Sequence, residues 1–215
     1  MSTVSVIASQ LTIYIGTSSI LTGLEYDCAP PLNINDSELQ PDMQQLPRSH
    51  PSAEFTNTSF LHHSLQTTSL RAKLCALGNS LHCALDFQEI LQYERKIQDG
   101  LSQIPKWSDH NEFQAWTLLD LQLRQFLVIL HTPRVLQTRF RLQPDYRYSI
   151  LTCLESSSVL IDHHIQLIDT GVFALCCIRS DYYRAALLIS HIAYHAAASS
   201  GSFTLLPMPR STTDL

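Results

Sequence analysis

Two histidines four positions apart come nearest to a metal site in this chain. His191 and His195 lie in the run SHIAYHAAA, and on a helix this spacing places both rings on one face. A zinc protease motif would carry a glutamate directly after the first histidine, whereas Ile192 follows here. Small residues surround the pair and a third ligand is missing, so we interpret both as partly buried structural histidines. A small helical metal-binding protein or enzyme that uses His191 and His195 is the alternative.

The other titratable residues match no catalytic signature. The adjacent histidines His62-His63, and His163-His164 after Asp162, project from different sides of a helix and make no site unaided. His131 stands near the end of a predicted helix, where a cation stabilises the helix dipole. Asp181 precedes an apolar run and suits a surface N-cap. The chain has no G-x-S-x-G and no G-x-G-x-x-G motif. We therefore predict no catalytic residue, no bound cofactor and no metal site.

Six cysteines raise the question of a zinc module, because zinc clusters need closely spaced C-x-x-C pairs. No such pair exists here, and two of the cysteines are adjacent. Cysteines in apolar helical stretches behave as small buried hydrophobes. The six are Cys28, Cys75, Cys83, Cys153, Cys176 and Cys177. We expect no zinc cluster in this chain.

The composition is typical of a globular protein in which many side chains are buried. Of 215 residues, 45% are hydrophobic and 15% charged, which favours a globular domain with a sizeable core. The net charge of -5 leaves no excess of positive charge for phosphates. Arg139, Arg141 and Arg147 form the nearest approach to a basic patch, which we interpret as a solvated loop. No apolar run reaches the roughly 18 residues of a membrane helix. We predict no direct DNA binding by this chain and no membrane span.

A polar, proline-rich segment, Asp27–Phe60, is too polar for a core and too particular for a generic linker. The pair Pro30-Pro31 forces an extended entry, because proline fixes its own φ and disfavours helix in the residue before it. Asp36 is placed to cap a short turn over residues 37–39, which Pro41 would end. We expect an ordered but irregular stretch.

Beyond this segment the apolar spacing is helical, and we predict an all-α fold, an irregular helical bundle with an extended, proline-rich N-terminal segment. The predicted helices cover residues 61–77, closed by Gly78-Asn79, then 85–100, 111–131, 148–167 and 172–198. The helix over 111–131 has the strongest pattern, with Asp109 as its N-cap and Thr132-Pro133 as its end.

The same periodicity separates buried from exposed residues. The predicted core residues of the central helix are Phe113, Trp116, Phe126 and Leu130. The outer face of the helix over 85–100 is predicted to carry Glu94, Arg95, Lys96 and Asp99.

These elements resemble the fungal-specific transcription factor domain, the middle homology region of zinc binuclear-cluster (Zn2Cys6) regulators. The resemblance starts with D-x-x-P-P-x-N-I-N-D-S-E-L and P-x-x-E-F-T-N-T-S-F, over residues 27–60. It continues through Ile104-Pro105-Lys106-Trp107, then LLDLQLRQFLVILHTPRV over 118–135 and SILTCLESSSVLI over 149–161. Members of that family begin the domain with an Arg/Trp-bearing helix pair, which nothing before Asp27 matches. The chain thus resembles the later half of the domain only, with the zinc finger absent.

The resemblance implies a non-enzymatic, transcription-factor-like regulatory domain that acts in the nucleus without its own DNA-binding zinc cluster. Protein partners or self-association are expected, and a small-molecule effector is an open option. The predicted division is an atypical N-terminal segment 1–26, an irregular Pro/Asn/Asp-rich segment 27–58, a helical regulatory domain 59–198 and a flexible tail 199–215. A truncated gene product without a function of its own is a further alternative, which exposed apolar surface and self-association would favour.

Overall fold

The computed structural model describes residues 29–40, 42–79, 85–107, 110–137, 143–173 and 179–201. Within these ranges the chain forms one 3-10 turn, η1 (Asp36–Glu38), and six α-helices. The helices are α2 (Ser59–Gln66), α3 (Thr68–Gly78), α4 (Phe87–Ser102), α5 (His110–Leu136), α6 (Pro144–Asp169) and α8 (Asp181–Gly201). No strand occurs in the described ranges, so the predicted all-α fold is confirmed there.

Several sequence predictions concern residues outside these ranges. They are the N-terminal segment 1–26, the prolyl stop at Pro41, the cap at Asp109, the basic residues Arg139 and Arg141, the cysteines Cys28, Cys83, Cys176 and Cys177, and the tail beyond residue 201.

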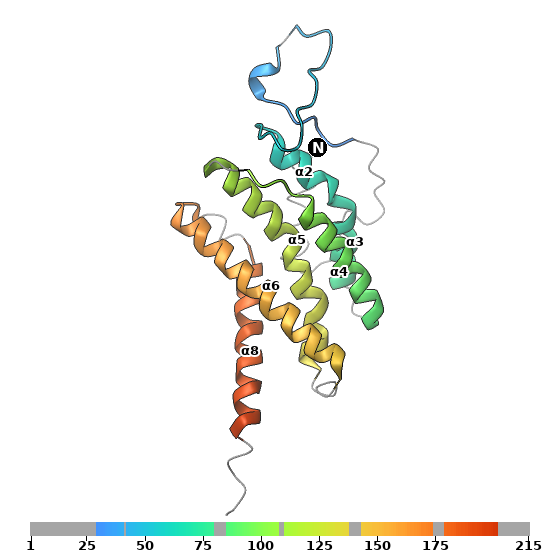
Figure 1. The fold of residues 1–215 in the computed structure, drawn as a ribbon, viewed down its shortest axis with the longest axis vertical. Coiled ribbons are helices and arrows are strands. Elements are labelled where there is room, and N and C mark those ends of the chain that lie inside the picture. Colours follow the sequence, from blue (N-terminus) through green and yellow to red (C-terminus); the bar gives the residue numbers. More distant parts are fainter. Residues whose placement is uncertain are drawn as a thin grey trace, which may run out of the picture.

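Helix α5 is the central element of the fold, with α3 and α4 packed on one side and α6 and α8 on the other (Figure 1). It supplies residues to two hydrophobic clusters. The first joins α3, α4 and α5 through Leu74, Cys75, Ile90, Ile97, Leu123, Phe126, Leu127 and Leu130. The second joins α5, α6 and α8 through Leu121, Val128, Val135, Cys153, Leu160, Leu167, Ala185 and Leu188. The irregular segment before α2 lies at one end of the molecule, and α8 projects at the other (Figure 1).

The single helix predicted over residues 61–77 is instead two helices, α2 and α3, that meet at Thr67. The Ser64 carbonyl accepts hydrogen bonds from the Thr67 and Thr68 hydroxyls at 3.2 and 3.3 Å and from the Arg71 guanidinium at 2.7 Å. Side-chain donors of this kind compete with the helical backbone bond. The threonine pair is the sequence signal of this break.

Helix α5 continues through Pro133 to Leu136, so the predicted stop at Thr132-Pro133 is wrong. Proline at this position removes one backbone donor near the helix end, where few further bonds are affected. Val135, only 2% exposed, packs in the second cluster and stabilises the last turn. Long-range packing here outweighs the local effect of proline.

The two C-terminal helices also differ from their predicted bounds. Pro144-Asp145 favours a helix start in the sequence, and Pro144 does occupy the first turn of α6, so the helix starts before the predicted residue 148. After Asp169, Gly171 adopts a φ of 84°, and the amides of Gly171 and Val172 bond to the carbonyls of Ile168 and Leu167. This is a Schellman motif, which ends a helix. Because Val172 belongs to that motif, it cannot begin the last helix, which starts at Asp181.

The predicted core of α5 is correct for two of its four residues. Phe126 and Leu130 are buried, at 0% and 5% exposure. Phe113 and Trp116 are only half-buried. The Trp116 ring packs edge-on against His163 at a centroid distance of 5.3 Å, near the N-terminal end of α5. Removing the Trp116 side chain should therefore cost less than truncating a fully buried aromatic residue.

Candidate functional site

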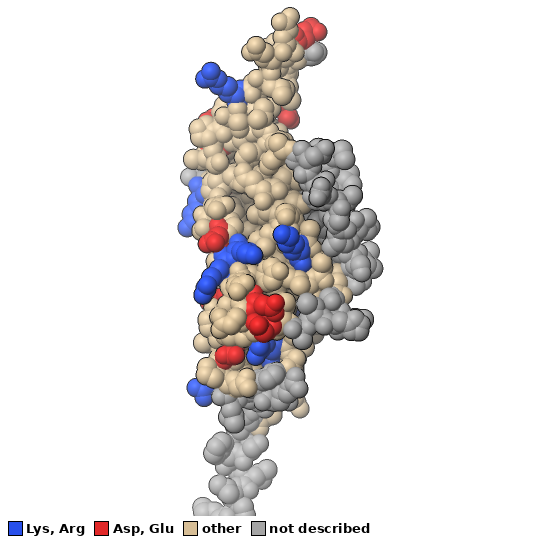
Figure 2. All heavy atoms as spheres, turned by 90° about the vertical axis from the view of Figure 1, so that its right-hand side faces the viewer, with Lys and Arg blue, Asp and Glu red and all other residues tan. Residues whose placement is uncertain are grey.

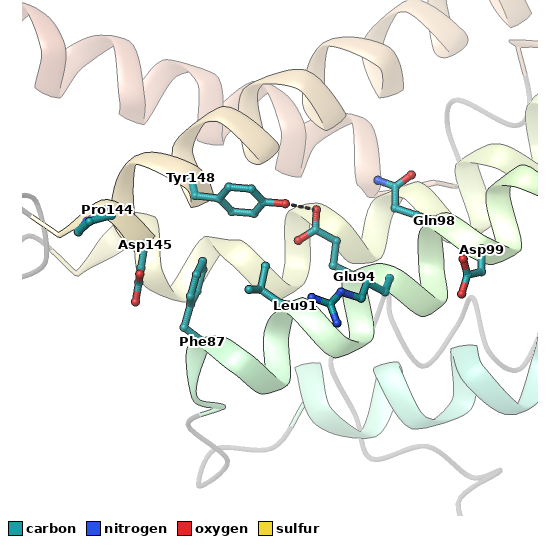
Figure 3. A pocket seen from close by; sticks show the side chains of 9 residues that line it. Phe87, Leu91, Glu94, Gln98, Asp99, Pro144, Asp145 and Tyr148 are labelled. Carbon is teal, nitrogen blue, oxygen red and sulfur yellow. Dashed lines mark hydrogen bonds between the residues drawn. The ribbon is translucent and has the colours of Figure 1, made fainter.

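A groove between α4 and the first turns of α6 has a volume of about 680 Å³ (Figure 3). Its lining combines aromatic, aliphatic and charged side chains: Phe87, Leu91, Glu94, Arg95, Gln98, Asp99, Pro144, Asp145 and Tyr148. The Tyr148 ring reaches from α6 toward Glu94 of α4, and Phe87 and Leu91 lie beside them (Figure 3). Six of these nine side chains are polar or charged. Small-molecule sites are typically lined mostly by apolar residues with a few polar groups, so this groove is more polar than such a site.

Glu94, His131 and Tyr148 belong to three different helices and meet at the base of this groove. The Tyr148 hydroxyl donates a hydrogen bond to Glu94 Oε1 at 2.8 Å. His131 Nε2 lies 3.3 Å from Glu94 Oε2, and His131 Nδ1 lies 3.1 Å from the Ser149 hydroxyl. The His131 ring is fully buried, whereas Tyr148 is 42% exposed. The cluster therefore ties α4, α5 and α6 together and reaches solvent through Tyr148.

Two sequence predictions are wrong at this cluster. Glu94 was expected on the solvated face of its helix but is buried, because it lies between Ile90 and Ile97 on the core face. This i, i+4, i+7 spacing was a signal that could have found it. His131 was expected to stabilise a helix C-terminus, but α5 continues past it and its ring contacts Glu94 instead.

The electrostatics of the groove do not suit acid–base catalysis at neutral pH. Burial favours a higher pKa for Glu94, but the contact with His131 and the hydrogen bond from Tyr148 outweigh it and hold that pKa below its ordinary value of 4.5. Burial and the bond to Glu94 raise the pKa of Tyr148 above its ordinary value of 10.0. An efficient general acid or base needs a pKa near the working pH. Both shifts move away from that range, which favours a structural role.

The neighbouring residues His163 and His164 face different carboxylates, as their adjacent positions on one helix require. His163 Nδ1 lies 3.3 Å from Asp120 Oδ2, and Arg124 donates two bonds to Asp120 at 2.6 and 2.7 Å. The His164 ring, on the other side of α6, bonds to Asp181. Burial favours a higher pKa for Asp120, but the bonds from Arg124 and the contact with His163 hold that pKa below 3.8. Both carboxylates therefore remain ionised and join helices to one another.

Asp181 is buried, at 3% exposure, so its predicted role as a surface cap is wrong. His164 Nε2 lies 3.0 Å from Asp181 Oδ1, and Arg179 donates from both Nε and a terminal nitrogen to Asp181 Oδ2. The carboxylate also accepts a bond from the Tyr182 backbone amide at 3.1 Å. Since His164 is 0% exposed, no substrate reaches this His–Asp pair in the described structure.

Neither the buried thiols of α3 and α6 nor the histidine pair of α8 forms a reactive or metal-binding site in the described ranges. Burial raises the pKa of Cys75 to about 11 and that of Cys153 to about 12, so both stay protonated and unreactive near pH 7. His191 and His195 stack edge to face with a centroid distance of 4.4 Å. In the described ranges, no group of three or more His, Cys, Asp or Glu residues is placed to hold a metal ion.

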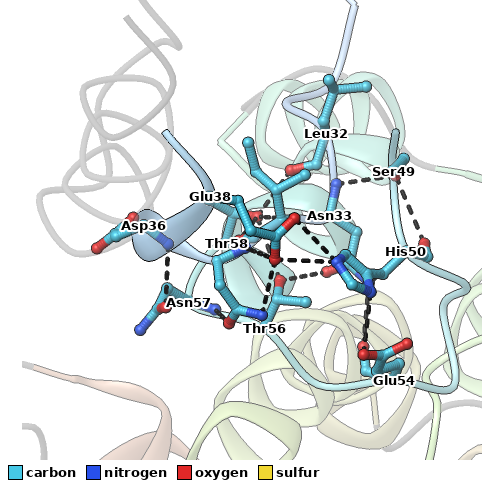
Figure 4. Close-up of polar contacts among 12 residues, drawn as sticks. Leu32, Asn33, Asp36, Glu38, Ser49, His50, Glu54, Thr56, Asn57 and Thr58 are labelled. Carbon is cyan, nitrogen blue, oxygen red and sulfur yellow. Dashed lines mark hydrogen bonds and ion pairs between the residues drawn. The ribbon is translucent and has the colours of Figure 1, made fainter. Parts of the chain in front are cut away.

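A network of hydrogen bonds holds the irregular segment against the start of α2 (Figure 4). Buried Asn33 lies at its centre, and its side-chain oxygen accepts bonds from the Thr56 and Ser59 hydroxyls, each at 2.7 Å. Asn35, not Asp36 as predicted, precedes η1 and forms a capping box with Glu38. These contacts join residues more than twenty positions apart, so the segment is ordered without regular secondary structure.

A second feature of this segment is a histidine held between two carboxylates (Figure 4). His50 Nε2 lies 2.9 Å from Glu38 Oε1, and His50 Nδ1 lies 2.9 Å from Glu54 Oε1. A neutral imidazole donates from one nitrogen only, so both contacts are satisfied only by the imidazolium. The bonds to Glu54 and then Glu38 raise the pKa of His50 above 6.5, and the bond from His50 lowers the pKa of Glu38 below 4.5.

The order of this segment is expected to depend on pH through that contact. The contribution of His50 is fully present below pH 6.5 and is lost as the pH rises through its raised pKa. The contribution of Glu38 is present above pH 4.5 and is lost as the pH falls through its lowered pKa. Amide hydrogen exchange should therefore show the greatest protection of residues 33–58 at pH values between the lowered pKa of Glu38 and the raised pKa of His50. An NMR titration should give a pKa above 6.5 for His50.

The His50→Gln substitution supplies the control for this prediction. It should bring the pKa of Glu38 back toward 4.5 and remove the loss of protection on the alkaline side. A His50 ring that titrates at or below 6.5, or an unchanged alkaline loss in the variant, would contradict the assignment.

The surface carries scattered charges and several exposed apolar side chains. On the face drawn in Figure 2, acidic and basic residues are interspersed and most of the surface is uncharged. Exposed apolar residues include Leu151 on α6 at 66% and, on α8, Tyr183 at 62%, Leu187 at 72% and Tyr194 at 71%. None of the helices in the described part of the chain has the length and hydropathy of a bilayer span.

Comparison with curated proteins finds fungal transcription factors. Transcription factor lepE of Aspergillus flavus is 27% identical over 157 residues, which cover 69% of this chain and 18% of that protein. Transcription factor opdR of Penicillium oxalicum is 26% identical over 161 residues, 66% of this chain and 20% of that protein. Transcription factor phm2 of Pyrenochaetopsis sp. is 20% identical over 163 residues, 71% of this chain and 21% of that protein.

These relatives confirm the resemblance to fungal transcription factors that the sequence motifs predicted. The chain spans about a fifth of the length of the curated relatives it matches. No family model matches the chain, and no solved structure matches it.

Proposed function

We propose that this chain is a non-enzymatic regulatory domain of the kind found in fungal transcription factors and that it acts in the nucleus. The observation that carries the proposal is the similarity to several fungal transcription factors over roughly two thirds of the chain. Regulation in this proposal comes from a helical scaffold that contacts other proteins. DNA recognition belongs to a separate zinc-cluster module.

The chemistry of the described residues supports a role other than catalysis. The polar clusters of Glu94, Asp120 and Asp181 are buried between helices. Despite burial, contacts with neighbouring side chains, led at Asp181 by the charge of Arg179, hold the pKa of each carboxyl below its ordinary value. Groups of this kind connect elements and are not poised for proton transfer.

Charge supports the absence of direct DNA binding. The net charge is -5, and basic residues do not gather into a patch on the face seen in Figure 2. Binding to DNA depends on neutralising phosphates with clustered Lys and Arg. The purified chain alone should therefore not retard a DNA duplex at physiological salt.

A reporter assay tests the regulatory role. The full chain is fused to an unrelated DNA-binding domain in a fungal host, and expression from a reporter with the matching DNA site is compared with that domain alone at equal protein level. We expect changed reporter expression and a nuclear signal for the fluorescently labelled chain. A Phe126→Asp fusion, which places a charge in the core, should return expression to the level of the DNA-binding domain alone. Unchanged expression with a folded fusion would overturn the proposal.

The outer face of α8 supports a more specific proposal, which is that the chain associates with a second copy of itself. Its exposed residues Tyr183, Leu187 and Tyr194 follow helical spacing, and no Asp, Glu, Lys or Arg occurs from Ala185 to Gly201. Two copies of a chain with net charge -5 repel each other least where the contact surface is uncharged. We therefore propose that this face pairs with the same face of a second copy.

The exposed side chains of α8 match those of a second, antiparallel α8. A two-fold axis between Ser190 and His191 places Leu187 opposite Tyr194 of the second copy, in an isologous contact. The same axis places bulky Tyr183 opposite small Ala198. Large and small side chains thus alternate across the contact, as close packing requires.

The Leu187→Glu substitution is expected to weaken this dimer at least about tenfold, because each copy would bury an unpaired carboxylate. Light scattering coupled to size exclusion should show the wild-type mass rising above 24.3 kDa with concentration and the variant remaining near that value. Leu151→Glu, at a similarly exposed leucine on α6, is the matched control and should leave the dimer intact. A wild-type mass of 24.3 kDa at every concentration, or equal behaviour of both variants, would contradict the pairing.

A further inference from the structure

A second, smaller pocket lies where the end of α3, the C-terminal half of α5 and the first turn of α8 come together. Its volume is about 300 Å³, at the lower limit for small-molecule sites. The lining residues are Leu74, Cys75, Gly78, Asn79, Phe126, Ile129, Thr132, Pro133 and Arg184. Three helices thus contribute to one concave surface that neither the polar clusters nor the groove beside Tyr148 use.

Arg184 is the charged residue of this pocket, and it has no ion-pair or side-chain hydrogen-bond partner in the described part of the chain. The nearby carboxylate of Asp181 is already bonded to His164 and Arg179. Other arginines of the same helical core are paired, as Arg124 is with Asp120. Burial lowers the pKa of Arg184, although a guanidinium remains charged at any physiological pH.

The remaining lining is apolar or already bonded. Leu74 and Phe126 form a buried apolar floor, at 1% and 0% exposure. The Thr132 hydroxyl donates to the Val128 carbonyl at 2.6 Å, and the Cys75 thiol has a pKa raised by burial to about 11, so it carries no charge. Among the described residues, no aspartate or glutamate lines the pocket. The pocket therefore presents one positive charge at an apolar surface.

We propose that this pocket binds a small monocarboxylate, with the acid group paired to Arg184 and an aliphatic or aromatic body against the more accessible Ile129 and Pro133. A planar guanidinium matches a carboxylate through two parallel hydrogen bonds. One arginine balances a single negative charge, whereas a phosphate group would bring excess charge to an apolar wall. The proposal concerns binding by the folded chain and goes beyond the regulatory role, on which it does not depend.

Phenylacetate and its uncharged counterpart phenylacetamide are suitable probes, because the two differ mainly in the charge of the head group. Titration of the full chain, followed by amide shifts in NMR spectra, should give a Kd on the order of 1 mM for phenylacetate, as expected for a ten-atom ligand. The largest shifts should fall on Asn79, Thr132 and Arg184. Phenylacetamide should bind at least about tenfold more weakly, because it lacks the charge-assisted bonds.

Variants at the arginine separate pocket binding from adventitious contact. Arg184→Gln should weaken phenylacetate at least about tenfold and leave phenylacetamide unchanged, whereas Arg184→Lys should retain part of the affinity. Arg147→Gln, at an exposed arginine on α6, is the control and should bind like the wild type. Circular dichroism confirms that each variant is folded. Equal binding of the two probes, unchanged affinity in Arg184→Gln, or shifts scattered over the surface would overturn the proposal.

Discussion

The Asp181→Ala substitution is expected to lower the free energy of unfolding by about 3–5 kcal/mol. The Asp181 carboxylate is buried and bonded to His164 and Arg179, which are themselves 0% and 8% exposed. Removing it leaves the Arg179 guanidinium buried without its anion and removes the bond that holds α8 against α6. Chemical denaturation followed by circular dichroism measures the loss.

Two variants make this expectation specific. Asp181→Asn keeps the size and one acceptor oxygen, so its cost should be smaller than that of Asp181→Ala. Asp162→Ala removes an exposed carboxylate from α6 and should change stability by less than about 0.5 kcal/mol. Despite burial, Arg179 and His164 hold the pKa of Asp181 far below 3.8, so its contribution is present above that pH and is lost only in stronger acid. A loss below about 1 kcal/mol in Asp181→Ala at pH 7 would contradict the role of this cluster.

Asp181 also illustrates what sequence patterns cannot reveal. Its position before an apolar run predicted a helix cap, and it does begin α8 and accept a bond from the Tyr182 amide. Its burial depends on His164, seventeen positions earlier on another helix. No local pattern encodes that contact, because it follows from how α8 crosses α6.

The helices themselves were largely predictable, since apolar residues at helical spacing directly report a buried face. Predictions were wrong where side chains altered the backbone locally, as Thr67 and Thr68 do between α2 and α3, or where packing overrode a local signal, as at Pro133. Glu94 shows an intermediate case. Its spacing from Ile90 and Ile97 placed it on the core face, but its charge suggested solvent. The partners that make its burial tolerable, His131 and Tyr148, come from two other helices.

The pocket beside Arg184 was not predictable from the sequence. Its walls come from helices separated by up to about a hundred residues. What distinguishes Arg184 from an exposed arginine such as Arg147 is its partial burial without an ion-pair or side-chain hydrogen-bond partner among the described residues. Such a property exists only once the chain is folded.

The Asn33→Asp substitution is expected to destabilise the irregular segment by about 3 kcal/mol or more at pH 7. The Asn33 amide nitrogen donates to the Pro51 and Glu54 carbonyls at 3.1 and 3.0 Å. A carboxylate has the same shape but replaces this donor with an oxygen, so oxygens would face oxygens in a buried site. Amide protection within residues 33–58 should fall roughly 100-fold, while the core of α5 changes less.

A second asparagine in the same segment gives the matched control. Asn57 is exposed, and its side-chain oxygen accepts a bond from the Asp36 amide at 3.2 Å, a role that a carboxylate also fills. Asn57→Asp should therefore change protection little, within about 0.5 kcal/mol.

The pH dependence of Asn33→Asp adds a further test. Burial raises the pKa of a carboxyl group at position 33, and its protonated form recovers one hydrogen-bond donor. The loss in Asn33→Asp, measured against the wild type at each pH, should thus be largest near neutrality and smaller in acid. If Asn33→Asp lost the same protection at neutral and at acidic pH, or if the two substitutions caused equal losses, Asn33 would not hold this segment through its amide donors.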